Sequence, residues 1–323
     1  MTATMPDRRA ADIDGVDDMD VLASAPPPVP TAAPRKVKAR KPARRPAEGP
    51  AAVVSSAATM VALVSLWFVA QALFLSDVSQ EREQDLLYTK FRKDLAAATV
   101  SLGPTTPPGE PVALLSIPRL GLSQVVVEGT ASGDTLAGPG HLRQTVLPGQ
   151  VGTSLVMGRA ATYGAPFGRL DQVVVGDEIK VVMGQGEVSF DVVNVRRAGD
   201  PYSQPLAAGG ARLTLVTAEG SGRLAALTPS SVLYVDADAP KGFVPPSGLP
   251  RSVPDSELAL HRDPSAYPLL ALHLALLLAV TLGVVAARQR WSAAAVWVVA
   301  APLALALAWS TTDVVMRLLP NVM

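Results

Sequence analysis

Three long stretches of this sequence contain no charged residue, and they constrain the possible folds more than any other feature. They are residues 51–75, 267–287 and 291–312. Each reaches the roughly 20 apolar residues that a helix needs to cross the hydrocarbon core of a membrane. The sequence therefore predicts three transmembrane helices, and a purely cytosolic enzyme is not expected.

Basic residues beside these stretches predict the topology. Residues 1–50 contain nine Pro and few large apolar residues, which predicts a disordered, Pro-rich and basic tail. Seven of the eleven residues from 35 to 45 are Arg or Lys, and such residues stay on the cytoplasmic side of a neighbouring span. The tail is too long and too polar to be part of a cleavable signal peptide, so span 51–75 is expected to be a retained anchor. Anionic membrane lipids are the expected partner of the basic run.

The same charge rule orients the rest of the chain. Arg288 and Arg290 lie between the second and third spans and place that turn in the cytoplasm. The N-terminus is then cytoplasmic, residues 76–266 are extracytoplasmic, and residues 313–323 are outside or at the interface. The external segment has no basic stripe with interleaved aromatic residues, so no nucleic-acid partner is expected.

The external segment changes from a helical to a strand pattern along its length. Residues 76–105 contain a helix, in which Leu86, Leu87, Phe91 and Leu95 form an apolar face, and then a linker. Residues 106–240 contain short β-branched runs separated by Gly, Pro and Asp turns, and residues 241–266 form a Pro/Gly/Ser linker back to the membrane. The predicted strands are 112–117, 125–127, 154–157, 173–175, 179–183, 188–195, 213–217 and 232–235. This mostly β pattern favours a closed barrel or a sandwich.

Six short motifs follow one another within this β region. They are Ile117-Pro118-Arg119-Leu120-Gly121-Leu122, Val127-Glu128-Gly129-Thr130, Gly138-Pro139-Gly140-His141, Leu147-Pro148-Gly149-Gln150, Thr162-Tyr163-Gly164-Ala165-Pro166-Phe167 with Leu170-Asp171, and Gly176-Asp177-Glu178-Ile179. In this order and spacing they resemble the sortase family, most closely its class E type from actinobacteria. The resemblance covers residues 112–239 and implies an eight-stranded β-barrel. It also implies a membrane-anchored cysteine transpeptidase, which cuts a sorting signal between Thr and Gly with a Cys nucleophile, a His and an Arg.

All three catalytic positions that the resemblance implies are changed in this chain. The Cys position falls on Ala218, the His position on Arg159, and the Arg position on Val232, or on Ser231 if the register shifts by one. The whole sequence has no Cys, which also excludes disulfides and thiolate metal sites. An alanine carries no nucleophile, and an arginine does not lose its proton at accessible pH. The sequence therefore predicts a catalytically inactive homologue.

Further residues are candidates for ligand contacts or for substitute catalysis. The residues expected to line a binding groove are Arg159, Thr162, Tyr163, Ala218, Arg223 and Val232. The alternative for Arg159 is a solvated arginine at a strand end. Ser221 lies in the loop after Ala218 and is the candidate for a substitute nucleophile, but it needs a base. His141, the candidate base outside the linker and the spans, is expected to make a structural hydrogen bond at a turn.

These patterns predict a binding or scaffold subunit at the outer face of the cell membrane. Its expected partners are membrane lipids, a membrane or cell-surface protein, and a peptide that resembles a sorting signal. No cofactor is expected, and the scattered His and carboxylates have no metal-ligand spacing. The competing hypothesis is an active hydrolase or transpeptidase that uses a non-Cys nucleophile or a thiol supplied by a partner.

Overall fold

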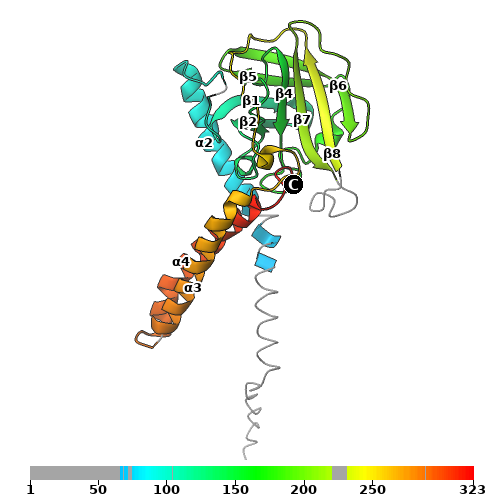
Figure 1. Cartoon of the computed structure of the whole chain (residues 1–323). Helices are drawn as coiled ribbons and strands as arrows, with labels where there is room; N and C mark the ends of the chain where they lie inside the picture. The colour runs from blue at the N-terminus through cyan, green and yellow to red at the C-terminus, as the bar shows by residue number, and fades with distance from the viewer. Residues whose placement is uncertain (1–65, 68, 72–74, 104, 220–230, 288) are drawn as a thin grey trace, which may run out of the picture. The chain divides into compact units, whose positions relative to one another are not determined.

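The computed structural model describes residues 66–67, 69–71, 75–103, 105–219, 231–287 and 289–323 (Figure 1). The predicted tail (1–50), most of the first predicted span (51–75) and the segment 220–230 lie outside these described residues. Predictions about them, including the groove candidate Arg223 and the candidate nucleophile Ser221, therefore stay predictions.

Eight strands form a closed barrel, which decides between the two β architectures that the sequence left open (Figure 1). The strands are β1 (Pro111–Ile117), β2 (Leu122–Glu128), β3 (Gly140–His141), β4 (Gly152–Met157), β5 (Glu178–Met183), β6 (Gly186–Arg197), β7 (Ala211–Glu219) and β8 (Ser231–Ala239). Their order around the barrel is β1-β2-β3-β4-β7-β8-β6-β5, and β5 pairs back to β1. The pairs β2–β3 and β4–β7 are parallel, and the others are antiparallel.

Two strand assignments differ from the prediction. Residues 173–175 do not form a strand: Val173 is a buried residue after a 3-10 turn, and the Val174 N–H donates to Asp177 Oδ2 at 2.8 Å. Only Val173 of this run is packed, since Val174 and Val175 are 47% and 63% exposed. Conversely, β3 was missed because two residues are too few to show a period-2 pattern. Gly140 is required in β3, since a Cβ there would overlap the carbonyl oxygen of Gly129.

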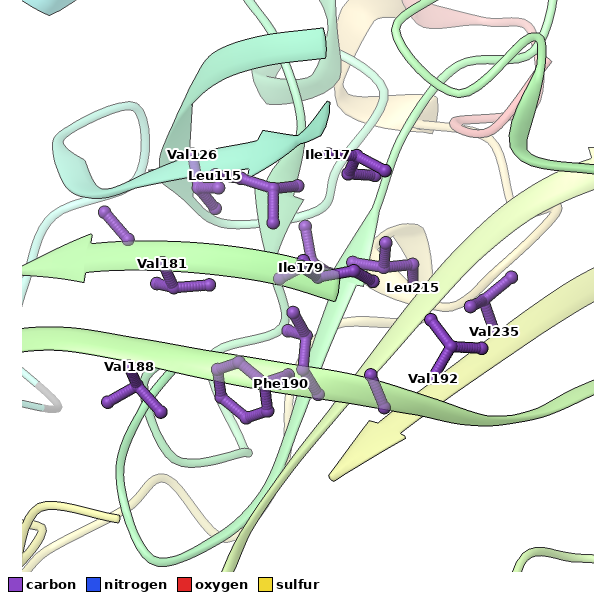
Figure 2. Close-up of a cluster of buried hydrophobic side chains, with 14 of the residues drawn as sticks. Leu115, Ile117, Val126, Ile179, Val181, Val188, Phe190, Val192, Leu215 and Val235 are labelled. Carbon is purple, nitrogen blue, oxygen red and sulfur yellow. The ribbon is translucent and has the colours of Figure 1, made fainter. Parts of the chain in front are cut away.

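The barrel interior is filled by alternate side chains of the strands, as a small closed barrel requires. Figure 2 shows Leu115, Ile179, Leu215 and Val235 pointing toward one another from four different strands. Phe190 of β6 is fully buried in the same cluster. Aliphatic packing of this kind makes a rigid support for the ends of the strands, where the candidate site lies.

Helix α2 spans Ser76–Ala96 and packs against the outside of the barrel. Phe91 is buried, but Leu86 and Leu95, which were predicted on the same apolar face, are 55% and 38% exposed. The predicted apolar face is therefore only partly used. A polar residue supplies the rest of the attachment, because Gln84 accepts the N–H of Val125 at 2.7 Å and donates to its carbonyl at 3.1 Å.

Helices α3 (Tyr267–Ala287) and α4 (Ala293–Arg317) follow the barrel. Within the described part of the chain, the segments Pro264–Val284 and Ala294–Arg317 are long and apolar enough to cross a membrane. The prediction was three spans, so two have a candidate helix here and the span at 51–75 remains a prediction.

The segment between the barrel and α3 is attached to the barrel by a buried ion pair. Glu257 is 3% exposed, and its carboxylate accepts hydrogen bonds from the Arg143 Nε at 2.9 and 3.1 Å. Its carbonyl also accepts the hydroxyl of Thr130 at 2.6 Å. The linker therefore has a fixed path across the end of the barrel that carries the candidate site.

Candidate functional site

The last residue pairs of β7 and β8 place two of the predicted site residues side by side. Ala218 and Val232 are register partners in this antiparallel pair, and both are buried. Ser231, the alternative position for the family's Arg, pairs with Glu219 and is half-buried. Two alkyl side chains thus stand where the resemblance implies a thiol and a guanidinium.

The end of β4 brings the third position to the same place. The Gly158 N–H donates to the Val216 carbonyl at 2.9 Å, and the Thr217 hydroxyl donates to the Gly158 carbonyl at 2.9 Å. Gly158 has no room for a side chain, because a Cβ would overlap the Phe167 ring. These contacts fix the backbone that carries Arg159 next to the end of β7.

Arg159 is completely buried, so the expectation of a solvated arginine is wrong. Its guanidinium donates to the Thr162 hydroxyl at 3.0 Å and to the carbonyl and hydroxyl oxygens of Ser132 at 2.9 and 2.8 Å. The ring of Tyr163 lies 5.6 Å from its Cζ, a cation–π distance. Burial lowers the pKa of Arg159 to about 10, so the side chain is still a cation at neutral pH.

The Thr162–Tyr163 turn connects the barrel to both neighbouring helices. Tyr163 adopts a left-handed φ of 52°, and its N–H donates to the Ser76 hydroxyl at the start of α2. Its own hydroxyl donates to Asp313 of α4. Burial and the charge of Asp313 raise the pKa of Tyr163, so it remains a neutral hydrogen-bond donor.

The segment after α4, residues 318–323, runs through the site. Val322 is fully buried and packs in the apolar cluster that contains Ala218 and Val232. Its carbonyl accepts the N–H groups of Ala160 at 3.1 Å and Ala218 at 3.4 Å. Ala218 and Val232 thus share one apolar cluster with a distant part of the same chain, whereas the Arg159 side chain contacts Ser132, Thr162 and Tyr163. Figure 1 marks this end of the chain beside the barrel.

Asn321 fixes the same segment by polar contacts. It is completely buried, and its Nδ2 donates to the carbonyls of Thr130 at 2.7 Å and Leu258 at 3.0 Å. Its own carbonyl accepts the Thr135 hydroxyl at 2.8 Å, and its N–H donates to the His261 carbonyl at 3.1 Å. No motif in the sequence had indicated this residue.

The three histidines are all engaged in hydrogen bonds. His141 lies in β3 rather than at the predicted turn, and it is buried between Glu128 Oε2 at 2.9 Å and the Val146 carbonyl at 2.8 Å. This is the structural hydrogen bonding that was expected of it. His261 contacts the Ala259 carbonyl, and His273 in α3 contacts the carbonyl one turn earlier. Among the described residues, no group of His, Cys, Asp or Glu has the arrangement of a metal site.

Comparison with known proteins identifies what this barrel is similar to. A family model described as the Sortase domain matches residues 115–226. Sortase D of Bacillus subtilis (strain 168) is 26% identical over 126 residues, which are 39% of this chain and 61% of that protein. The match therefore spans less than two thirds of the relative.

Solved sortase structures have similar but more distant sequences. A Clostridium perfringens Sortase D5 transpeptidase is 19% identical with a TM-score of 0.38, and the match covers 50% of this chain and 97% of that one. The SrtF sortase from Corynebacterium diphtheriae is 22% identical with a TM-score of 0.36, covering 47% and 94%.

Proposed function

The barrel of this chain is a sortase-family domain, and we propose that it acts by binding rather than by catalysis. In this proposal the protein is a noncatalytic subunit at the outer face of the cell membrane. Its groove binds an extended peptide that resembles a sorting signal, or its barrel and helices hold another membrane or cell-surface protein.

The chemistry of three side chains carries this proposal. Ala218 and Val232 have no polar side-chain atom, and Arg159 keeps its proton at neutral pH. Acyl transfer needs an activated nucleophile and a group that exchanges protons near the working pH. None of the three can supply either function, whereas a groove of alkyl groups and backbone N–H donors suits peptide binding.

Membrane attachment supports the outer-face location. Helices α3 and α4 have the length and composition of spanning helices. The basic run at 35–45 favours a cytoplasmic N-terminus and an anchor at 51–75, with lipids as direct partners. In this proposal the barrel therefore lies on the extracytoplasmic side.

A turnover and labelling experiment tests the proposal against an enzyme. The full chain in nanodiscs is incubated with sorting-signal peptides and hydroxylamine, and separately with a fluorophosphonate probe for reactive serines. We expect no peptide product and no label. Turnover or labelling that Ser221→Ala abolishes, while the exposed linker variant Ser247→Ala leaves it unchanged, would establish a substitute nucleophile and overturn the proposal.

A second experiment identifies the partner. Cross-linking and mass spectrometry in native membranes should join the barrel or the α3–α4 hairpin to another protein. Cross-links confined to the chain itself would argue against a scaffold role.

A further inference from the structure

The candidate groove already contains a peptide segment, and its contacts define what the groove binds. The segment 318–323 leaves α4 after Arg317, and Pro320 prevents the helix from continuing because it has no N–H to donate. From there the segment lies against the strand ends of the barrel. It makes three kinds of contact there: a side chain in a pocket, hydrogen bonds from its backbone, and hydrogen bonds from a side-chain amide.

The side-chain pocket takes an aliphatic residue. Val322 has no exposed surface, and its neighbours in the cluster come from four different parts of the barrel. They are Leu142, Met157, Val216, Ala218 and Val232. Full burial of a Val side chain stabilises such contacts because it removes apolar surface from water. The alanine at 218 is part of this pocket.

The backbone of Val322 is held by hydrogen bonds that do not depend on its side chain. The Val322 carbonyl accepts N–H groups from Ala160, after β4, and from Ala218, in β7. One residue further on, the Met323 carbonyl accepts the Thr162 hydroxyl at 2.9 Å. The segment is held as a turn, because the Met323 N–H donates to the Pro320 carbonyl at 3.2 Å, and the main-chain contacts to the barrel add to the side-chain pocket.

The amide site selects Asn one residue earlier. The Asn321 side chain donates to two buried carbonyls, those of Thr130 and Leu258. A site with buried acceptors discriminates strongly against a side chain that cannot donate, because the acceptors would be left unpaired.

Arg159 forms hydrogen bonds to two side chains beside this groove, Thr162 and Ser132. Its guanidinium bonds to Thr162, which contacts Met323, and to Ser132, whose hydroxyl donates to the Met316 carbonyl at 3.0 Å. Arg159 is thus a positioning residue: it orders Thr162, which contacts the segment, and Ser132, which contacts the last turn of α4.

We infer that the groove is a binding site for a turn-forming segment with Asn followed by a small aliphatic residue, and that residues 318–323 are its resident intramolecular ligand. A partner segment of the same pattern enters only when this resident leaves. The inference rests on the proposed function and adds to it the ligand pattern and a self-occupied state. Because α4 tethers the resident near the site, its effective concentration is high and free peptide competes poorly.

Occupancy is tested with engineered cysteine pairs, for which a chain without Cys is suited. Ala160→Cys with Val322→Cys in the full chain in nanodiscs should join rapidly through a short thiol-to-thiol cross-linker. The control pair Val244→Cys with Val322→Cys places one thiol on a linker residue that is 78% exposed and should not join. Equal joining of both pairs, or of neither, would overturn the inference.

Binding is tested with a labelled peptide of the sequence of residues 317–323. The double variant Asn321→Ala, Val322→Asp releases the resident and should bind this peptide about tenfold or more tightly than the wild type does, since a larger fraction of sites is open. The milder variant Asn321→Ala serves if the double variant does not fold. A peptide carrying the same two changes should not bind.

The cross-linked protein is the final control for peptide binding. It should bind no peptide, and equal binding by cross-linked, wild-type and released proteins would overturn the inference. These outcomes are separate from those of the turnover experiment: cleavage by the wild type would end the noncatalytic proposal but would leave the cross-linking result intact.

Discussion

Arg159 is a buried cation, and in the described part of the chain it forms no ion pair with a carboxylate. Its charge is stabilised by neutral oxygens of Ser132 and Thr162 and by the Tyr163 ring. The flat, forked guanidinium reaches these groups at once, which a lysine ammonium does not do. The residue at this position therefore has a structural role that depends on arginine.

Replacing Arg159 with lysine tests this role. We expect Arg159→Lys to lower the free energy of unfolding by about 1–3 kcal/mol, because hydrogen bonds to a buried charge are lost. The control Arg119→Lys changes a half-exposed arginine that pairs with Asp177, and it should cost less than about 0.5 kcal/mol. Chemical denaturation of the full chain in detergent measures both. Equal stability of the two variants would show that Arg159 is not a positioning residue.

Asp134 predicts a pH-dependent stability. Burial, and then the negative charge of Glu257, raise its pKa to about 6. The folded state thus holds the proton more firmly than the unfolded state, so this group's contribution to stability falls as pH rises from about 4 to 6.

The variant Asp134→Asn removes that penalty. Its melting temperature should exceed that of the wild type by about 2–4 °C at pH 8, and the difference should disappear near pH 4. Thermal unfolding at both pH values measures it. A difference of the same size at both pH values would mean that ionisation of Asp134 is not its cause.

At the scale of elements, long strands were predictable and short or polar attachments were not. Strands such as β6 and β7 have clear alternation or β-branched runs, whereas the two residues of β3 have none. The prediction of a strand at 173–175 is wrong because consecutive β-branched residues are typical of strands, whereas only Val173 is buried here and the other two are exposed. Gln84 was missed because its contact with β2 joins positions 41 residues apart and follows no local period.

The candidate site was predictable only in the part that the barrel itself contributes. Ala218 and Val232 are register partners, and Gly158, the residue before Arg159, is hydrogen-bonded to Val216 of β7; all three positions were located by motifs along the sequence. The partner segment at 321–323 lies 89 or more residues away from them in the sequence, and only the fold brings the two together. Ser221 and Arg223 stay untested predictions, since the structure does not describe 220–230.

The turn after β4 makes a prediction about packing. A side chain at Gly158 would overlap Phe167, so Gly158→Ala should destabilise the chain by about 1–3 kcal/mol. Gly133→Ala is the matched control, because its new Cβ would lie 3.6 Å or more from the nearest atoms. That change should stay within about 0.5 kcal/mol. Denaturant unfolding of both variants compares them, and a harmless Gly158→Ala would refute the close approach.

At the scale of the whole molecule, the contact between the barrel and residues 318–323 bears on topology. Two helices of spanning length separate them. Two crossings return a chain to the side from which it started, so the contact is compatible with a hairpin of two spans and incompatible with an odd number. This agrees with the charge rule, which places the connecting Arg288 and Arg290 in the cytoplasm.

Whether a bound peptide stays intact tests most directly whether this domain binds peptide without cleaving it. A sorting-signal peptide is incubated with the full chain in nanodiscs, using the wild type and the variant Asn321→Ala, Val322→Asp. Peptide retained on the protein is then weighed by mass spectrometry together with the protein. The account predicts more peptide on the variant, all of it at full mass, and no mass added covalently to the chain. Shortened peptide, or an acyl adduct on the wild-type chain, would contradict it.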